Sequence, residues 1–180
     1  MSELRLELKG LREEQARMTQ IVADLHGAPM LEGMRNATLL VTRDAKRFAP
    51  VDTGRLRASI TPEVRVNGPA SIQGVVGSNV TYAPFVELGT KPHWPPMAAI
   101  TAWAHRKGIG GIYSIKTRRR VGSKATQESQ DVAVAFLVAR AISMRGTKAV
   151  KYLERAFTEN RERIVRYIDA AVQAIIRSND

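Results

Sequence analysis

The chain has 180 residues, with 28 lysines and arginines against 17 acidic residues, a formal net charge of +11 and no cysteine. The lack of cysteine excludes disulfide frameworks, thiolate zinc sites and cysteine nucleophiles. The hydrophobic content of 44% is typical of a globular protein, and the longest apolar stretch, residues 132–139, is far too short to cross a membrane. The N-terminus lacks the apolar core of a signal peptide. We therefore expect a single domain over residues 1–180, soluble and made in a cytoplasm, with no membrane partner.

The first fifty residues predict one strand and two helices. Leucines alternate with charged residues over 4–9, which is the period of a half-buried strand. Residues 11–25 have the apolar spacing of a helix, and Gly27 and Pro29 end that helix. Over about 30–48 the apolar residues recur every three or four positions. A second helix with one buried face is therefore expected there.

Strands are predicted after the second helix. The Pro50–Gly54 segment breaks the chain, because proline keeps the preceding residue out of the helical region and glycine can take a positive φ. The alternation over 60–66 predicts a strand, and an Asn-Gly-Pro turn leads to a return strand beginning near 72–76. The segment 80–88 alternates imperfectly around a proline. We expect an edge strand or a bulge there.

The sequence of the C-terminal half predicts helices before and after a long irregular loop. A helix over 96–104 is expected because proline is favoured at the first helical position. Residues 108–127 hold four glycines and show no clear period. The segment 132–142 is apolar nearly all round, which predicts a buried helix capped by Ser129. A final helix carries an apolar stripe that could pack inside the subunit or between copies: Val150, Phe157, Ile164 and Ala171.

These elements together predict an α+β fold. It consists of a small, twisted, mainly antiparallel sheet flanked by helices. A long insertion at about 105–145, made of a basic loop and a helix, forms an arm. We find no internal repeat. Trp94 and Trp103 are predicted to anchor the connection before the arm to the core, because large aromatic rings favour burial.

Two motifs at a set distance give the strongest functional signal. The first runs from Ala49 to Ile60 and reads APVDTGRLRASI, and the second runs from Val76 to Thr90 and reads VGSNVTYAPFVELGT. In combination they resemble the tail-completion or neck proteins of lambdoid tailed phages, a family similar to the minor tail protein Z group. The resemblance covers nearly the whole chain, and the insertion is its main departure.

The resemblance implies a structural virion protein that joins the head to the tail, with an α+β fold and no cofactor. Such proteins form rings, with sixfold symmetry implied here, between the head connector and the tail tube. The implied partners are other copies of the chain, the head-closure protein, and the tail terminator or tail tube. Assembly would take place in the cytoplasm of the host bacterium. We expect the segment 78–96 and the basic arm to be the contact surfaces.

The motif residues also have physical roles of their own. Asp52 or Thr53 can accept backbone N–H bonds in a tight turn. Glu87 could accept backbone donors, or pair with Arg55 or Arg57 within a subunit or across a ring interface. The structural set predicted from the two motifs is Pro50, Asp52, Thr53, Gly54, Leu56, Tyr82, Glu87, Gly89 and Thr90.

The sequence does not support a reactive site. Asp52 and Glu87 lack a companion base, nucleophile or metal ligand, so paired-carboxylate chemistry is not indicated. The three histidines are too scattered for a zinc site, and no phosphate-binding loop is present. We expect no catalytic, cofactor or metal residue and no enzyme activity.

A basic run stands apart from the nearly balanced remainder of the chain. Residues 105–124 hold seven lysines and arginines and no acidic residue. One interpretation is phosphate contact with genomic DNA in the channel, which salt would weaken. A second is docking onto an acidic neighbouring ring, and a third is a solvated loop that becomes ordered only in the particle. The residues concerned are Arg106, Lys107, Lys116, Arg118, Arg119, Arg120 and Lys124.

The alternative function is a nucleic-acid-binding module that uses this arm. It predicts DNA affinity with a steep salt dependence, lost when Arg118, Arg119 and Arg120 become glutamate. No recognition helix or zinc finger supports reading of base sequence.

Overall fold

The computed structural model describes residues 10–68, 71–110, 112–113, 120–121 and 123–179. The chain forms two compact units. Unit 1 comprises residues 1–49, 56–79 and 152–180, and unit 2 comprises residues 50–55 and 80–151. The strand predicted over 4–9 lies outside the described residues. No described helix is both long and apolar enough to span a bilayer.

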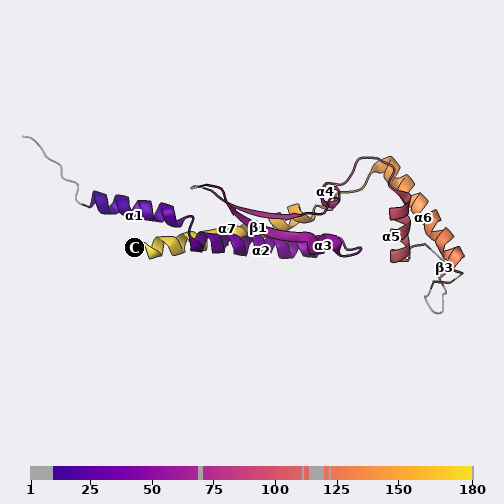
Figure 1. The fold of residues 1–180 in the computed structure, drawn as a ribbon, viewed down its shortest axis with the longest axis horizontal. Coiled ribbons are helices and arrows are strands. Elements are labelled where there is room, and N and C mark those ends of the chain that lie inside the picture. Colours follow the sequence, from indigo (N-terminus) through magenta and orange to yellow (C-terminus); the bar gives the residue numbers. More distant parts are fainter. Residues whose placement is uncertain (1–9, 69–70, 111, 114–119, 122, 180) are drawn as a thin grey trace, which may run out of the picture. The chain divides into compact units, whose positions relative to one another are not determined.

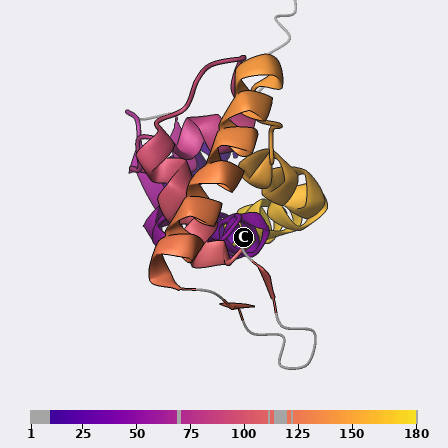
Figure 2. The same ribbon diagram turned by 90° about the vertical axis from the view of Figure 1, so that its right-hand side faces the viewer.

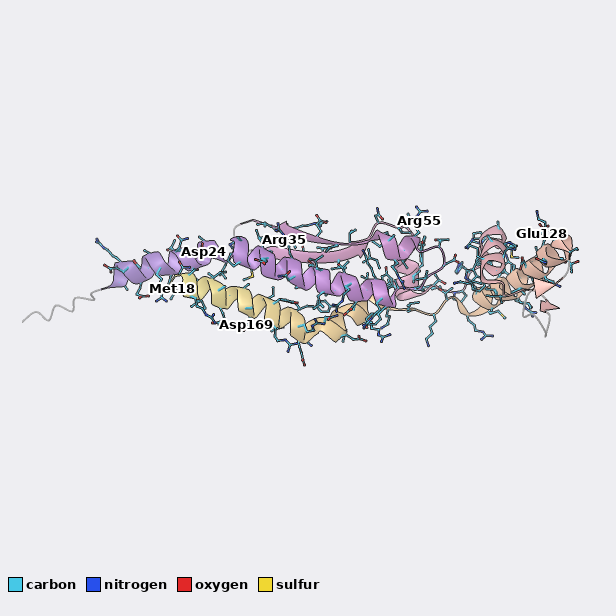
Figure 3. The ribbon with its side chains drawn as sticks, turned by 90° about the horizontal axis from the view of Figure 1, so that it is seen from below. Met18, Asp24, Arg35, Arg55, Glu128 and Asp169 are labelled. Carbon is cyan, nitrogen blue, oxygen red and sulfur yellow. The ribbon has the colours of Figure 1, made fainter. Side chains whose placement is uncertain are left out.

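Unit 1 is built around one central helix. Its elements are α1 (Leu11–Asp24), α2 (Ala28–Phe48), most of the short α3 (Arg55–Ser59), β1 (Ile60–Val66), β2 (Ile72–Ser78) and α7 (Tyr152–Ser178). The strands pair antiparallel, with Ile60 opposite Ser78 and Val66 opposite Ile72. Helix α2 runs along the strand pair (Figure 1) and also contacts α7. It therefore forms the middle layer of this unit (Figure 3).

The sequence of α2 explains its position. Pro29 lies in its first turn, where the missing N–H removes no helical hydrogen bond, and Ala49 leaves the helical region with ψ 130° directly before Pro50. Small residues let α2 and α7 approach closely, because a Cβ added at Gly33 would lie 2.9 Å from the Ala171 Cβ. At one end of this contact Met30, Ala171 and Ile175 are buried together, with partly buried neighbours at Ile21, Leu25, Ile72, Ile168 and Val172.

Unit 2 is mainly helical. Its elements are α4 (Ala83–Leu88), α5 (Met97–Lys107), the short strands β3 (Ile112–Tyr113) and β4 (Arg120–Val121), and α6 (Lys124–Arg145). Helix α5 packs beside α6 (Figure 2), and the contact is made by alanines, since Ala104, Ala135 and Ala139 are fully buried. Ser123 caps α6 by accepting a hydrogen bond from the Thr126 backbone N–H at 3.2 Å.

Much of the predicted order is confirmed. The helices expected over 11–25 and 30–48 are α1 and α2, and the hairpin expected after Pro50 is β1 and β2. The final helix is α7. The α+β class is therefore confirmed, although helix exceeds strand by far among the described residues.

The strand predicted over 80–88 is wrong. This segment forms the helix α4. Pro84 lies in its first turn and does not mark an edge strand. The six-residue helix ends at Gly89, which has φ 75° and ψ −176°. A segment this short fits either period, so the position of the proline decides its structure.

The predicted burial of the segment 132–142 is also wrong in part. Leu137 and Phe136 are 63% and 49% exposed, since only one side of α6 is covered within unit 2. The helix begins at Lys124, so Ser123 and not Ser129 caps it. Trp94 is 52% exposed and therefore does not anchor the core; its ring meets Phe136 edge-on at 5.8 Å between centroids.

Candidate interaction surfaces

The first motif forms a turn that is held by the end of α5. Arg106 Nε donates to Asp52 Oδ1 at 3.2 Å, and its Nη2 donates to Oδ2. Lys107 Nζ donates to the Val51 carbonyl oxygen at 2.9 Å. The Arg106 hydrogen bond, together with the charges of Arg106 and Lys107, lowers the pKa of Asp52 from its ordinary value, against an opposing effect of burial. The acceptor role predicted for Asp52 is thus directed at a side chain of α5. Gly54 has φ 82° in this turn.

The bonds to this turn involve two residues of the predicted basic contact surface. Arg106 and Lys107 bond within unit 2. Lys124 is exposed at the start of α6, and Arg120 lies in β4 without a described side chain. Lys116, Arg118 and Arg119 lie outside the described residues. The contact of this arm with DNA or protein stays a prediction.

The second motif ends in a backbone crossing of two glycine-containing segments. Thr90 N donates to the Thr147 carbonyl oxygen at 3.1 Å, and Thr147 N donates back to Thr90 at 3.2 Å. The two threonine hydroxyls are 2.9 Å apart. The contact continues where Val150 N donates to the Val86 carbonyl oxygen at 3.0 Å. The end of α4 is thereby joined to the chain that leaves α6.

Only glycine fits where the two segments cross. Gly146 has φ 72° and ψ −163°, and Gly89 has nearly the same backbone conformation. This region of φ and ψ is essentially restricted to glycine. A Cβ on Gly146 would collide with the Thr90 carbonyl oxygen, and one on Gly89 would lie 2.8 Å from Ala149 N. The signal that sequence reasoning missed is a repeated tripeptide, since Gly-Thr-Lys occurs at 89–91 and again at 146–148.

Other members of the motif set are placed as follows. Leu56 is buried in unit 1, and the Tyr82 carbonyl oxygen accepts the first N–H bonds of α4 while its side chain stays 39% exposed. The Glu87 carbonyl oxygen accepts the Lys151 N–H at 3.1 Å. The side-chain pairing of Glu87 with Arg55 or Arg57 stays a prediction.

A wide hollow lies beside the crossing. Its volume is about 1000 Å³ and its walls are mainly apolar. The Phe85 side chain is 59% exposed on it. The titratable residues among its described lining are Tyr82, Lys91, His93 and Lys148, and none of them is a carboxylate.

A second apolar groove belongs to unit 1. It has a volume of about 380 Å³ and lies between α2, β2 and α7, with Met34, Val76 and Phe157 among its lining residues. Phe157, a member of the stripe predicted on the final helix, is 57% exposed. Ala171 of the same stripe is buried. The stripe is therefore buried at the Ala171 end and exposed at Phe157.

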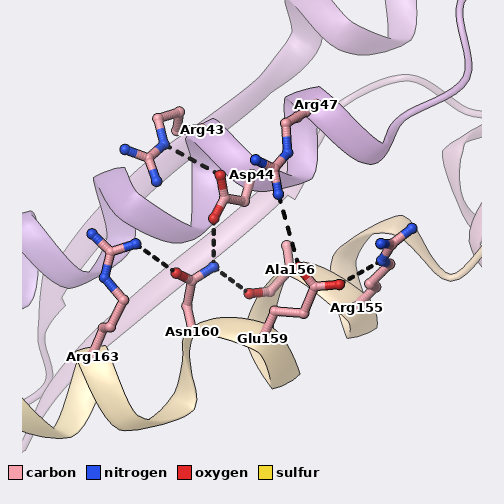
Figure 4. Close-up of polar contacts among 8 residues, drawn as sticks. All are labelled: Arg43, Asp44, Arg47, Arg155, Ala156, Glu159, Asn160 and Arg163. Atoms are coloured by element: carbon pink, nitrogen blue, oxygen red, sulfur yellow. Dashed lines mark hydrogen bonds and ion pairs between the residues drawn. The ribbon is translucent and has the colours of Figure 1, made fainter.

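A buried polar network joins α2 to α7 (Figure 4). Asn160 Nδ2 donates to Asp44 Oδ2 at 2.8 Å and to the Ala156 carbonyl oxygen at 2.9 Å. Arg43 Nε donates to Asp44 Oδ1 at 3.2 Å. The bond from Asn160 lowers the pKa of Asp44; burial opposes this, and the hydrogen bond and charge of Arg43 add to the lowering. Asp44 is not among the residues predicted from the sequence. The pattern that could have indicated it is a carboxylate next to Ala45 on the buried face of α2.

One other titratable pair lies in unit 2. His105 Nδ1 is 2.8 Å from Asp131 Oδ2, and that carboxylate is nearly fully buried between α5 and α6. Among the described residues, no group of three or more potential metal-binding side chains comes together. The pair fastens α5 to α6.

Comparison with known proteins finds a family match over the region that carries the two motifs. Residues 30–89, about a third of the chain, match the HK97-gp10-like family model, described as "Bacteriophage HK97-gp10, putative tail-component". The match indicates a phage tail component. It covers most of α2, the β1–β2 hairpin and α4, and it ends at Gly89 of the crossing. Searches of curated proteins and of solved structures found no significant match.

Proposed function

We propose that this chain is a structural virion protein of a tailed bacteriophage or prophage. Copies form a ring at the neck that joins the head connector to the tail, and the whole chain, with its arm at 105–145, acts as one assembly domain. The family match over 30–89 carries this proposal, because it includes nearly all of both sequence motifs. The protein works by complementary surfaces and without turnover.

Exposed apolar side chains support an assembly role. Leu88 and Phe85 of α4 are 74% and 59% exposed, and Phe157 stands open on the groove of unit 1. Soluble monomers rarely expose large contiguous apolar patches, and such patches commonly mark protein interaction sites. A closed ring would bury such patches through a repeated head-to-tail interface. The DNA-binding alternative is less supported, since Arg106 and Lys107 already bond within unit 2.

Mass photometry of the purified protein tests ring formation. We expect a species near six times the 19.9 kDa monomer mass, either alone or after addition of the adjacent neck proteins. Phe157→Asp should shift the population towards monomer, because a charge would enter an apolar interface. The matched control is Glu162→Asp on the same helix, which should leave the mass distribution unchanged. A monomer under every condition would contradict the ring.

A further inference from the structure

The hollow beside the Gly-Thr-Lys crossing has a composition that favours one kind of ligand. Its walls include the exposed rings of Tyr82 and Phe85 and the aliphatic side chains of Ile142 and Val150. Its rim carries the exposed cations Lys91 and Lys148, and the described residues that line it include no aspartate or glutamate. Apolar walls combined with unopposed positive charge favour a ligand that has both an apolar group and a carboxylate.

The hollow is also held open by its own backbone. Reciprocal bonds between Thr90 and Thr147 fix the two segments that carry Lys91 and Lys148. The His93 ring Nδ1 lies 2.9 Å from the Lys91 carbonyl oxygen, and the nearby prolines restrict the 92–96 segment. A preformed site loses less conformational entropy when it binds than a flexible one does.

We propose that this hollow binds a peptide segment of a neighbouring protein in which an acidic residue adjoins an aromatic or large aliphatic residue. The apolar side chain enters between Phe85 and Val150, and the carboxylate meets Lys91 and Lys148. A volume of about 1000 Å³ suits a few residues of an extended peptide. The proposal rests on the assembly role, because it gives the partner chemistry of the 78–96 contact segment.

Duplex DNA fits this hollow less well. Sequence-independent DNA binding depends on rows of cations that neutralise several phosphates. The described part of this rim holds two lysines, and most of the remaining described lining is apolar. Phosphates placed against the apolar walls would lose hydration without gaining hydrogen bonds, which is unfavourable.

The test is selection from a random dodecapeptide library on three immobilised proteins. These are the wild type, the Lys91→Glu/Lys148→Glu variant, and a control with the same change of charge, Arg161→Glu/Arg166→Glu, on exposed positions of α7. We expect wild type and control to enrich peptides with an acidic residue beside a Phe, Tyr, Leu or Trp. The affinity of the best peptide should fall about ten-fold or more on the lysine variant.

Amide chemical shifts then locate the binding site. Titration of the selected peptide into ¹⁵N-labelled wild type should move the Thr90 and Val150 amides, and Phe85→Ser, which keeps both lysines, should weaken binding. The proposal is overturned if no peptide is enriched, if basic peptides are, if the α7 control loses as much affinity, or if a 12-bp duplex displaces the peptide. Loss of this binding alone would leave the assembly role intact, since that role is judged from rings and particles.

Discussion

Replacing Gly146 with alanine should destabilise unit 2 by about 3 kcal/mol or more. The backbone at Gly146 has φ 72° and ψ −163°, and the new Cβ would collide with the Thr90 carbonyl oxygen. Both effects act at the crossing that joins the end of α4 to the segment after α6. For a chain of this length the loss corresponds to a fall in Tm of roughly 6–12 °C. Circular dichroism during heating measures it.

A matched glycine provides the control for this prediction. Gly77 in β2 has no positive φ and no neighbour within 4 Å of an added Cβ. Gly77→Ala should therefore change Tm little. Hydrogen exchange should also become faster at the Thr147 and Val150 amides in Gly146→Ala, because these amides donate across the crossing. Equal Tm changes in the two variants would show that the crossing does not stabilise the fold.

Asp44→Ala is expected to lower the free energy of unfolding by about 2–3 kcal/mol at pH 7. The change removes the acceptor of the Asn160 side-chain bond and leaves polar groups of Asn160 inside the α2–α7 contact. Urea denaturation measures the loss. Asp169→Ala, at an exposed position of α7 (Figure 3), is the control and should cost less than about 0.5 kcal/mol.

The effect of Asp44 should depend on pH with a definite sign. The folded-state pKa of Asp44 lies below its ordinary value of 3.8, chiefly because Asn160 donates to the carboxylate. Its ionised form therefore stabilises the fold fully above the unfolded-state pKa, and this contribution is lost as the pH falls through the folded-state pKa. The difference between wild type and Asp44→Ala should shrink between pH 7 and pH 2. A difference that does not change with pH would mean that the charge of Asp44 has no part in stability.

Local sequence patterns were sufficient for much of the fold. The three-and-four spacing of α2 and the long stripe of α7 identify both helices, and a turn between two alternating segments identifies the β1–β2 hairpin. These signals depend on neighbours along the chain. The strand predicted at α4 is wrong because six residues cannot distinguish the helical period from the strand period. The full burial predicted for α6 is wrong because the composition of a helix does not determine how many neighbouring elements cover it.

The candidate surfaces depend on contacts that are distant in sequence. A sequence motif identifies Gly89 and Thr90, but the partner of Thr90, which lies 57 residues further on, is known only from the fold. The same holds for Arg106 of the predicted basic contact surface, whose bond to Asp52 spans 54 residues. The Asp44–Asn160 bond spans 116 residues. A periodic pattern carries no information about such pairs.

Electron microscopy of particles made with and without this gene tests the assembly role most directly. Deletion should leave filled heads and separate tails, and the wild-type gene supplied in trans should restore joined particles with the protein located at the head–tail junction. Fully tailed, infectious particles from the deletion strain would contradict the proposed function.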